Sequence, residues 1–409
     1  MRHPANHIFD LTPDTLEAWC ESRSMPKFRA RQILEWVYQK GVADPEKMSN
    51  LSKLDRSKLA AEITFFSGDI VRHQTATDGV QKLLIEWTEP TEPSGDKATS
   101  PSAEARRVTP LPVLPVPTED SGPGTEDLSG SPSPTPSLRP SVTPSLLPQT
   151  ECVMIPSDDR RTACISSQVG CPVGCRFCAS GIGGLEGNLS AGRIVEQVWR
   201  LSRLEGVDRI TNIVFMGMGE PLANFANVTR AIRIINSEWA FNISARKITI
   251  STVGLPQAIE RLASDFDLPV TLALSLHAPN DEIRRQLIPW AEYCTIADLL
   301  AACRRWFDKT GREITLEYTL LRGVNDLPEH AIELAKLSKQ LRANINLIRY
   351  NEVDGMPFKR PKQEDVLVFQ ELLRRQNVNA HIRASRGRDI AAACGQLRHE
   401  SGPKAKVIS

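Results

Sequence analysis

Four cysteines lie within fifteen consecutive residues, and three of them, Cys171, Cys175 and Cys178, have the spacing C-x3-C-x2-C. The fourth, Cys164, precedes this array by seven residues. A closed zinc site needs four protein ligands, whereas three thiolates suit a [4Fe–4S] cluster and leave one iron open to a small molecule. The spacing therefore predicts an iron–sulfur cluster. A zinc site that recruits Cys164 or Cys152 is the alternative.

The rest of the composition narrows the class of protein. Nine cysteines in 409 residues are too few and too clustered for a disulfide scaffold, so we expect metal binding or catalysis in a reducing compartment. No apolar run of about eighteen residues occurs, and the N-terminus lacks the apolar core of a secretory signal. We therefore expect a cytoplasmic protein without a membrane partner. A net charge of +1 excludes a protein that simply coats nucleic acid.

Residues 89–150 differ in composition from the rest of the chain. They hold fourteen of the twenty-nine prolines, among many Ser, Thr and Gly residues. Such a segment cannot bury enough apolar surface to offset its ordering entropy, so we predict a disordered insert. It separates two strand-like runs, 82–87 and 151–155, which we interpret as one hairpin with a lengthened loop, at about 0.6 kcal/mol per doubling of loop length. A linker between independent domains is the alternative.

The first 88 residues are predicted to form a helical accessory domain that ends with the start of this hairpin. Thr12 is a candidate cap for a short helix around Leu16 and Trp19. Residues 28–42 carry an apolar helical stripe, and a third helix begins near residue 52.

After the insert, short apolar runs alternate with amphipathic helices. The candidate strands are 163–167, 210–216, 247–252, 270–276, 314–320 and 344–350, with an additional one at 380–384. The candidate helices are 191–204, 228–236, 256–263, 296–310 and 327–341. This alternation favours a parallel sheet in an α/β fold. About six such units indicate an open, partial TIM-type barrel over residues 151–398, followed by a flexible tail at 399–409.

Polar motifs follow the carboxyl end of each predicted strand, where barrels of this kind collect their functional residues. The cysteine array follows the first strand. The other motifs are MGMGEP at 216–221, STVG at 251–254, SLHAPND at 275–281, LRGVND at 321–326 and YNE at 350–352. We therefore expect one functional site at this rim of the barrel.

With these residues in view, the chain resembles the radical S-adenosylmethionine (SAM) enzymes, in which C-x3-C-x2-C follows the first strand of a partial barrel. Gly219, Glu220 and Pro221 are similar to the GEP motif of that superfamily, whose backbone receives the amino group of SAM. The resemblance implies two cofactors, a [4Fe–4S] cluster held by the three cysteines and SAM.

Four further features narrow the resemblance. They are Cys164 ahead of the array, DDR at 158–160, SLHAPND at 275–281 and AAACGQL at 391–397. Together they resemble the bacterial radical methyltransferases that modify carbon 2 of adenine in 23S ribosomal RNA and in some transfer RNAs. The likeness runs from the N-terminal helices to about residue 398 and is interrupted only by the insert.

The resemblance implies a covalent relay, because carbon 2 of adenine is not activated for simple displacement. One SAM methylates Cys394 as a nucleophile. A second is cleaved to a 5′-deoxyadenosyl radical, which takes a hydrogen atom from that methyl group. The methylene radical then adds to the adenine. Glu151 matches the proton acceptor of the family, and Cys164 attacks Cys394 to form a transient disulfide and release the product.

The same resemblance implies the remaining site residues and partners. SAM would be bound by Gly219, Glu220, Ser251, Ser275, Leu276, His277 and Asn351. The expected partners are 23S rRNA and transfer RNA, with an electron donor such as flavodoxin or ferredoxin, and the expected state is a monomer. Arg383, Arg386 and Arg388 are candidates for binding phosphates beside the target base, or form solvated surface. Methylation at carbon 8 of the same adenine, and a zinc-stabilised RNA-binding module without catalysis, are the alternative functions.

Overall fold

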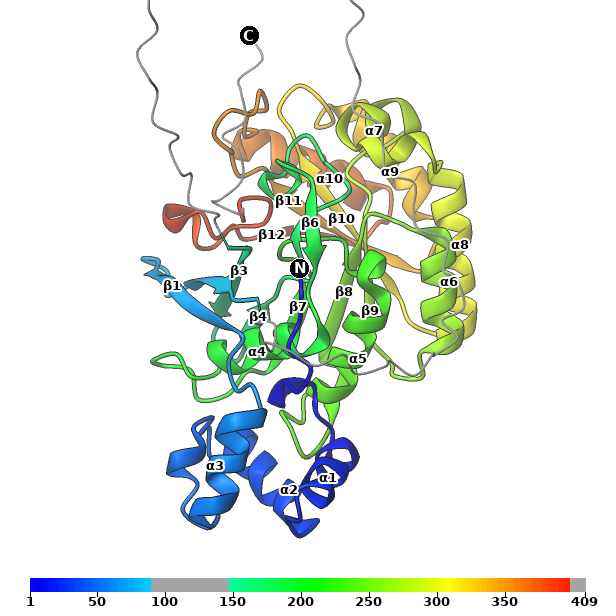
Figure 1. Ribbon diagram of the computed structural model, residues 1–409. Coiled ribbons are helices and arrows are strands. Elements are labelled where there is room, and N and C mark those ends of the chain that lie inside the picture. Colours follow the sequence, from blue (N-terminus) through cyan, green and yellow to red (C-terminus); the bar gives the residue numbers. More distant parts are fainter. Residues whose placement is uncertain (90–146, 398–409) are drawn as a thin grey trace, which may run out of the picture. The chain divides into compact units, whose positions relative to one another are not determined.

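The computed structural model describes residues 1–89 and 147–397. In this part of the chain, ten strands form one mixed sheet and two more form a small ribbon (Figure 1). The order across the large sheet is β1-β2-β3-β4-β7-β8-β9-β10-β11-β12. The predicted α/β architecture is confirmed.

Seven neighbouring strands of the large sheet run parallel. They are β4 (Arg161–Cys164), β7 (Asn212–Phe215), β8 (Ile248–Thr252), β9 (Thr271–Ser275), β10 (Ile314–Leu320), β11 (Ala343–Arg349) and β12 (Ala380–Arg383). All seven correspond to predicted strands, because each is a short apolar run between turn residues. In the described part of the chain, β1 and β12 are the two edge strands of this sheet and do not pair with each other, so the sheet does not close into a full barrel. The open, partial barrel is therefore confirmed.

Antiparallel strands extend the sheet beyond β4. They are β1 (Gly68–Thr75), β2 (Gln81–Trp87) and β3 (Gln149–Pro156). The predicted hairpin is confirmed, since β2 and β3 pair from Gln81↔Met154 to Glu86↔Gln149. Strand β1 has no predicted counterpart, because most of its side chains are exposed and leave no alternating apolar pattern.

The predicted insert of residues 89–150 lies mostly outside the described residues. Only Glu89 and residues 147–150 are described, and Gln149 and Thr150 already belong to β3. The predicted tail, 399–409, also lies outside them.

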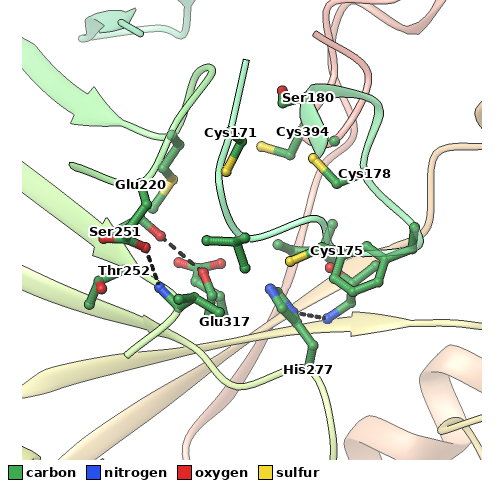
Figure 2. Close-up of a pocket in the computed structure, with 18 of the residues that line it drawn as sticks. Cys171, Cys175, Cys178, Ser180, Glu220, Ser251, Thr252, His277, Glu317 and Cys394 are labelled. Carbon is green, nitrogen blue, oxygen red and sulfur yellow. Dashed lines mark hydrogen bonds between the residues drawn. The ribbon is translucent and has the colours of Figure 1, made fainter. Parts of the chain in front are cut away.

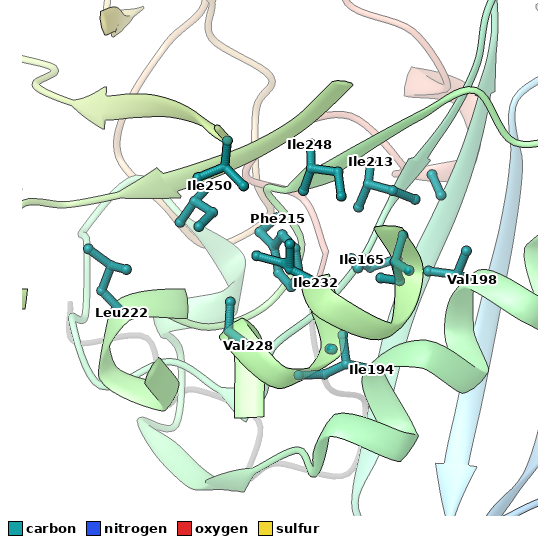
Figure 3. Packing of buried hydrophobic residues seen from close by; sticks show 14 of the residues in the cluster. Ile165, Ile194, Val198, Ile213, Phe215, Leu222, Val228, Ile232, Ile248 and Ile250 are labelled. Carbon is teal, nitrogen blue, oxygen red and sulfur yellow. The ribbon is translucent and has the colours of Figure 1, made fainter. Parts of the chain in front are cut away.

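The described residues after the insert form seven α-helices. They are α4 (Ala191–Leu201), α5 (Phe225–Asn236), α6 (Pro256–Asp265), α7 (Asp281–Leu287), α8 (Ile296–Thr310), α9 (Pro328–Ser338) and α10 (Gln363–Arg375). The five predicted helices are confirmed, while α7 and α10 were not predicted. Figure 3 shows Ile232 of α5 beside Phe215 of β7, and Ile194 of α4 belongs to the same buried cluster. Each such side chain contributes about 1.5–3 kcal/mol on burial, which fixes the strand ends that carry the site loops.

The N-terminal residues form three helices, α1 (Pro13–Ser22), α2 (Phe28–Leu34) and α3 (Lys53–Glu62). Thr12 caps α1 as predicted, because its hydroxyl accepts the backbone N–H of Thr15. The helix predicted over 28–42 is shorter than expected, and it continues as a π-helical segment, Glu35–Gln39.

This π-helical segment joins the N-terminal helices to the barrel. Tyr38 lies edge-on to Phe9, Trp239 and Phe241. The indole N–H of Trp199 in α4 donates to the carbonyl of Val37, the residue before Tyr38, at 2.8 Å. Both regions therefore share one hydrophobic core. In residues 1–89 and 147–397, no helix has the length and apolar character needed to cross a membrane.

Candidate active site at the carboxyl ends of the strands

The three cysteines of the C-x3-C-x2-C array lie in one loop after the short strand β5 (Gln168–Gly170), which pairs with β6 (Leu185–Asn188). Backbone bonds shape the loop: Cys171 N–H donates to Gly184 O at 2.9 Å, and Cys178 N–H donates to Cys175 O at 3.1 Å. All three side chains line one cavity, which we call the first chamber (Figure 2). The sequence spacing therefore translates into a single thiol-lined wall.

The thiols of this wall fit a [4Fe–4S] cluster. Burial raises the pKa of Cys171 to about 12, and burial also raises the pKa values of Cys175 and Cys178. Such thiols keep their protons unless a bound cation supplies positive charge. In the described ranges, no three His, Cys, Asp or Glu side chains gather closely enough to hold one metal ion. A cubane cluster needs no such gathering, because each thiolate binds a different iron.

The GEP loop after β7 lies on the opposite side of the first chamber (Figure 2). The Glu220 carboxylate accepts the N–H groups of Leu222 at 2.9 Å and Val253 at 2.8 Å. Burial raises the pKa of Glu220 to about 7, against the lowering effect of these two donors. Glu220 therefore ties the loops after β7 and β8 together, and Gly219 exposes backbone to the chamber.

The serines expected to bind SAM lie at the ends of neighbouring strands. Ser251 and Ser275 both line the first chamber, and their hydroxyl oxygens are 3.2 Å apart. Leu276 differs: it is fully buried, does not belong to the lining, and donates its N–H to the Glu317 carbonyl at 3.1 Å. The Leu276 side chain therefore does not reach the first chamber.

His277 lines the first chamber as a neutral ring. Its Nδ1 accepts the backbone N–H of Thr319 at 3.1 Å, which a protonated ring could not do. Burial, and then Arg284, lower the pKa of His277 to about 3. Its backbone has a φ of 57°, and its carbonyl accepts the Asn325 amide at 2.7 Å. These contacts hold His277 in place without a ligand.

Cys394 lies where the first chamber meets a second one, and it lines both. Its loop rests on the residues that follow the cysteine array: Ala179 N–H donates to Gly395 O at 2.8 Å, and the Ser180 hydroxyl donates to Leu397 O at 2.6 Å. Asn351, predicted to bind SAM, lines the second chamber and donates its amide to the Cys394 carbonyl at 3.3 Å.

Cys164, at the end of β4, lines the second chamber together with Cys394. Burial, and then Cys394, raise the pKa of Cys164 to about 12. All nine cysteines are free thiols, so the structure contains no disulfide, including the one expected between these two residues. The two sulfurs nevertheless belong to one cavity.

The three arginines that were candidates for phosphate binding or solvated surface lie in different places. Arg383 lines both chambers, Arg386 lines only the second, and Arg388 lines neither. Cys394, with smaller effects from Glu317 and Cys164, raises the pKa of Arg383 against the effect of its burial. Arg383 is therefore a cation in the wall between the chambers.

Glu151, the expected proton acceptor, lies outside the lining of both chambers. Its side chain is 4% exposed, and its Oε1 is 2.7 Å from the ammonium of Lys82 in β2. The Ser166 hydroxyl donates to its carbonyl at 2.6 Å. The structure thus places the buried Glu151 carboxylate outside the lining of both chambers, in contact with Lys82.

Two site residues were not found from the sequence. Glu317 of β10 lines the first chamber, and its buried Oε2 has no hydrogen-bond partner in the described part of the chain. A charged residue inside the apolar run ITLEYTL was the available signal. Lys82 carried no comparable signal, because its contact with Glu151 depends on strand register.

Comparisons with known proteins give consistent matches. A model of the Radical SAM superfamily matches residues 165–336, and a model of the ribosomal RNA large subunit methyltransferase N-terminal domain matches residues 6–64. A probable dual-specificity RNA methyltransferase RlmN from Rhodopirellula baltica is 35% identical over 398 residues, covering 97% of this chain and 92% of that protein. The dual-specificity RNA methyltransferase RlmN of Dichelobacter nodosus is 36% identical, covering 96% and 93%. The crystal structure of a radical SAM methyltransferase from Sphaerobacter thermophilus has a TM-score of 0.80 and 37% identity, covering 96% of this chain and 99% of that one.

Proposed function

The chain belongs to the RlmN family of radical SAM RNA methyltransferases, and from that premise we propose that it methylates carbon 2 of an adenine in 23S rRNA and in transfer RNA. One observation supports the proposal above others: Cys394 lines both the thiol-walled first chamber and the second chamber that holds Cys164. A residue that receives a methyl group at a SAM site and passes it to an RNA base must be accessible from both chambers.

Its cofactors, as for the superfamily, are a [4Fe–4S] cluster and SAM. Cys171, Cys175 and Cys178 would hold the cluster. The backbone at Gly219 and the hydroxyls of Ser251 and Ser275 would hold SAM. When bound, the two groups supply the electron and the hydrogen-abstracting reagent that an unactivated carbon requires.

The residues around the second chamber carry the remaining steps. Cys394 carries the methyl group as a thioether, and its loop presents that group to the base. Glu151 takes the proton that leaves carbon 2, and the unpaired electron on the ring passes to a one-electron acceptor of the iron–sulfur class. The Cys164 thiolate then attacks the Cys394 sulfur: an S–S bond forms, the C–S bond breaks, and the carbon keeps the electron pair and takes up a proton to complete the methyl group. A dithiol reductant returns both cysteines to the free state seen here.

The finer expectations stay predictions. An electron carrier of the flavodoxin or ferredoxin class would supply reducing electrons, and the protein would act as a monomer in the cytoplasm. Residues 1–88 would serve as the accessory domain and 151–398 as the catalytic domain.

The decisive variant is Cys394→Ala. Protein purified anaerobically and loaded with iron and sulfide is mixed with SAM, a reductant and a fragment of 23S rRNA, and the nucleosides are analysed by mass spectrometry. We expect no 2-methyladenine from Cys394→Ala, with iron content equal to that of the unchanged protein. Cys303→Ala, a substitution buried in α8 away from both chambers, is the matched control and should retain activity.

Continued formation of 2-methyladenine by Cys394→Ala would contradict the relay. Formation of 8-methyladenine by the unchanged protein would instead support the alternative position on the ring.

A further inference from the structure

The hairpin formed by β1 and β2 contacts the segment that leads to Cys394, although more than 300 residues separate them. Gly387 N–H donates to Asp78 Oδ2 at 2.9 Å, and Thr77 N–H donates to Asp389 Oδ2 at 2.9 Å. These reciprocal bonds fix the start of the segment against the hairpin turn.

Lys82 makes a third contact of a different kind. Its Nζ donates to the Ala391 carbonyl at 3.2 Å and also lies 2.7 Å from Glu151 Oε1. Ala391 has a φ of 51°, a conformation that residues with a Cβ adopt rarely and that surrounding contacts must hold. It lies three residues before Cys394. One ammonium therefore joins the expected proton acceptor to the loop of the expected methyl carrier.

Strand register creates this arrangement. Lys82 lies opposite Val153, and Leu84 lies opposite Glu151, so Lys82 and Glu151 are diagonal neighbours on one face of an antiparallel pair. Lys82 and Glu151 have side chains only 7% and 4% exposed. A lysine is rarely buried to this degree, and its burial is tolerated because its ammonium is paired with a carboxylate and also donates to a carbonyl. The surroundings of residue 82 therefore favour a buried ammonium over an apolar side chain.

We propose that Lys82 is a positioning residue, which keeps the Glu151 carboxylate ionised and joined to the Cys394 loop. The inference rests on the proposed function, because it concerns the step in which carbon 2 loses its proton. In that step the C–H bond breaks, its electron pair stays in the ring, the proton passes to a Glu151 oxygen, and the unpaired electron left by the radical addition passes to a one-electron acceptor of the iron–sulfur class, which restores the aromatic ring. Lys82 exchanges no proton and acts through the carboxylate.

A purely mechanical role for Lys82 predicts a different outcome. Loss of a tether would loosen the Cys394 loop and slow every step that needs it, as would loss of the bond from Thr77 to Asp389. Loss of the Lys82 charge beside Glu151 would instead slow the loss of the carbon 2 proton, a step that comes after the RNA is joined to Cys394. The covalent protein–RNA adduct would then accumulate.

The test compares Lys82→Met, Lys82→Arg and Glu151→Gln with Asp389→Ala as the matched control, which removes a hairpin contact but leaves the ion pair. The rate of 2-methyladenine formation and the fraction of protein bound to RNA under denaturing conditions are measured in the cluster-loaded full chain. We expect Lys82→Met to be slower by about 10- to 100-fold, a part of the 10²- to 10⁴-fold that a general base supplies, and to accumulate adduct. Lys82→Arg should restore most of the rate, and Asp389→Ala should accumulate no adduct.

A double-mutant cycle separates action through Glu151 from independent action. In the Glu151→Gln background, Lys82→Met should slow the reaction by less than about threefold. An equal slowing in both backgrounds, or a loss in Lys82→Met without adduct, would overturn the inference. If Lys82→Met fails to fold, Lys82→Gln replaces it with the same outcomes.

The outcome for Glu151→Gln alone tells the two proposals apart. If this variant turns over like the unchanged protein, the proposed role of Glu151 is wrong and the inference on Lys82 falls with it. If it stalls with adduct while Lys82→Met does not, only the inference on Lys82 is wrong.

Discussion

Gly219 gives the sharpest structural test of the first chamber. Its φ is +104°, and a Cβ built there would lie 2.7 Å from Gln168 Cβ and from Ser167 Oγ. A strained backbone residue costs about 1–3 kcal/mol, and overpacking costs about 1–3 kcal/mol more. Because the clash is with the strand that leads into the cysteine loop, Gly219→Ala must displace one wall of the chamber.

The matched control is Gly323→Ala. Gly323 also has a positive φ, +71°, but a Cβ there meets nothing within 4 Å, and the residue lines neither chamber. The control should therefore lose only the conformational part, about 1–2 kcal/mol.

Two assays measure the outcome for the anaerobic, cluster-loaded protein: the urea midpoint of unfolding and the dissociation constant for SAM by equilibrium dialysis. We expect Gly219→Ala to weaken SAM binding by about 10- to 100-fold, at 1.4 kcal/mol per tenfold, and Gly323→Ala to leave it unchanged. Equal SAM affinity in the two variants would refute this account of the GEP loop.

The remaining predictions concern stability and the insert. Glu196 is fully buried and contacts His7 at 3.1 Å, Arg200 at 2.7 Å and the Ser67 hydroxyl at 2.8 Å, so Glu196→Gln should lower the free energy of unfolding by about 3–5 kcal/mol. Asp10→Asn, which removes the partly exposed pair with Arg230, should lower the free energy of unfolding by less than about 1 kcal/mol. If chemical denaturation shows a loss for Glu196→Gln as small as that for Asp10→Asn, the buried network contributes little to stability. Deleting residues 91–146 shortens the connection between β2 and β3 about twelvefold, and loop entropy predicts a stabilisation of about 2 kcal/mol with full methylation activity. Loss of activity in that deletion variant would indicate a partner-binding role for the insert.

The sequence predicted elements whose signals are local. Helix α8 was predicted with its observed bounds, because Thr295 provides a capping box and Gly311 adopts the left-handed conformation that ends the helix. The parallel strands were found because both of their faces are covered. Strand β1 was missed, since an exposed edge strand needs no apolar alternation. The π-helical turn at Glu35–Gln39 was missed because it depends on packing of Tyr38 against distant aromatic residues.

The site shows the same division. The cysteine array and the GEP loop are local motifs, and the structure brings both to one chamber. The contact of Lys82 with Glu151 follows from strand register across the insert, which no local pattern encodes. Arg383 was a candidate for binding phosphate or for solvated surface; the structure places it in the wall between the chambers, and the sequence did not decide whether this strand-end residue points inward or outward.

The central claim is that Cys171, Cys175 and Cys178 hold a [4Fe–4S] cluster with one iron open to SAM. The most direct measurement is the iron and acid-labile sulfide content of the anaerobic protein after reconstitution, together with the change in its electron paramagnetic resonance spectrum when SAM is added. We predict about four iron and four sulfide per chain, a SAM-dependent change in the spectrum, and loss of both in the variant with all three cysteines replaced by alanine. A reconstituted protein without iron or sulfide, or an alanine variant that keeps them, would contradict the claim.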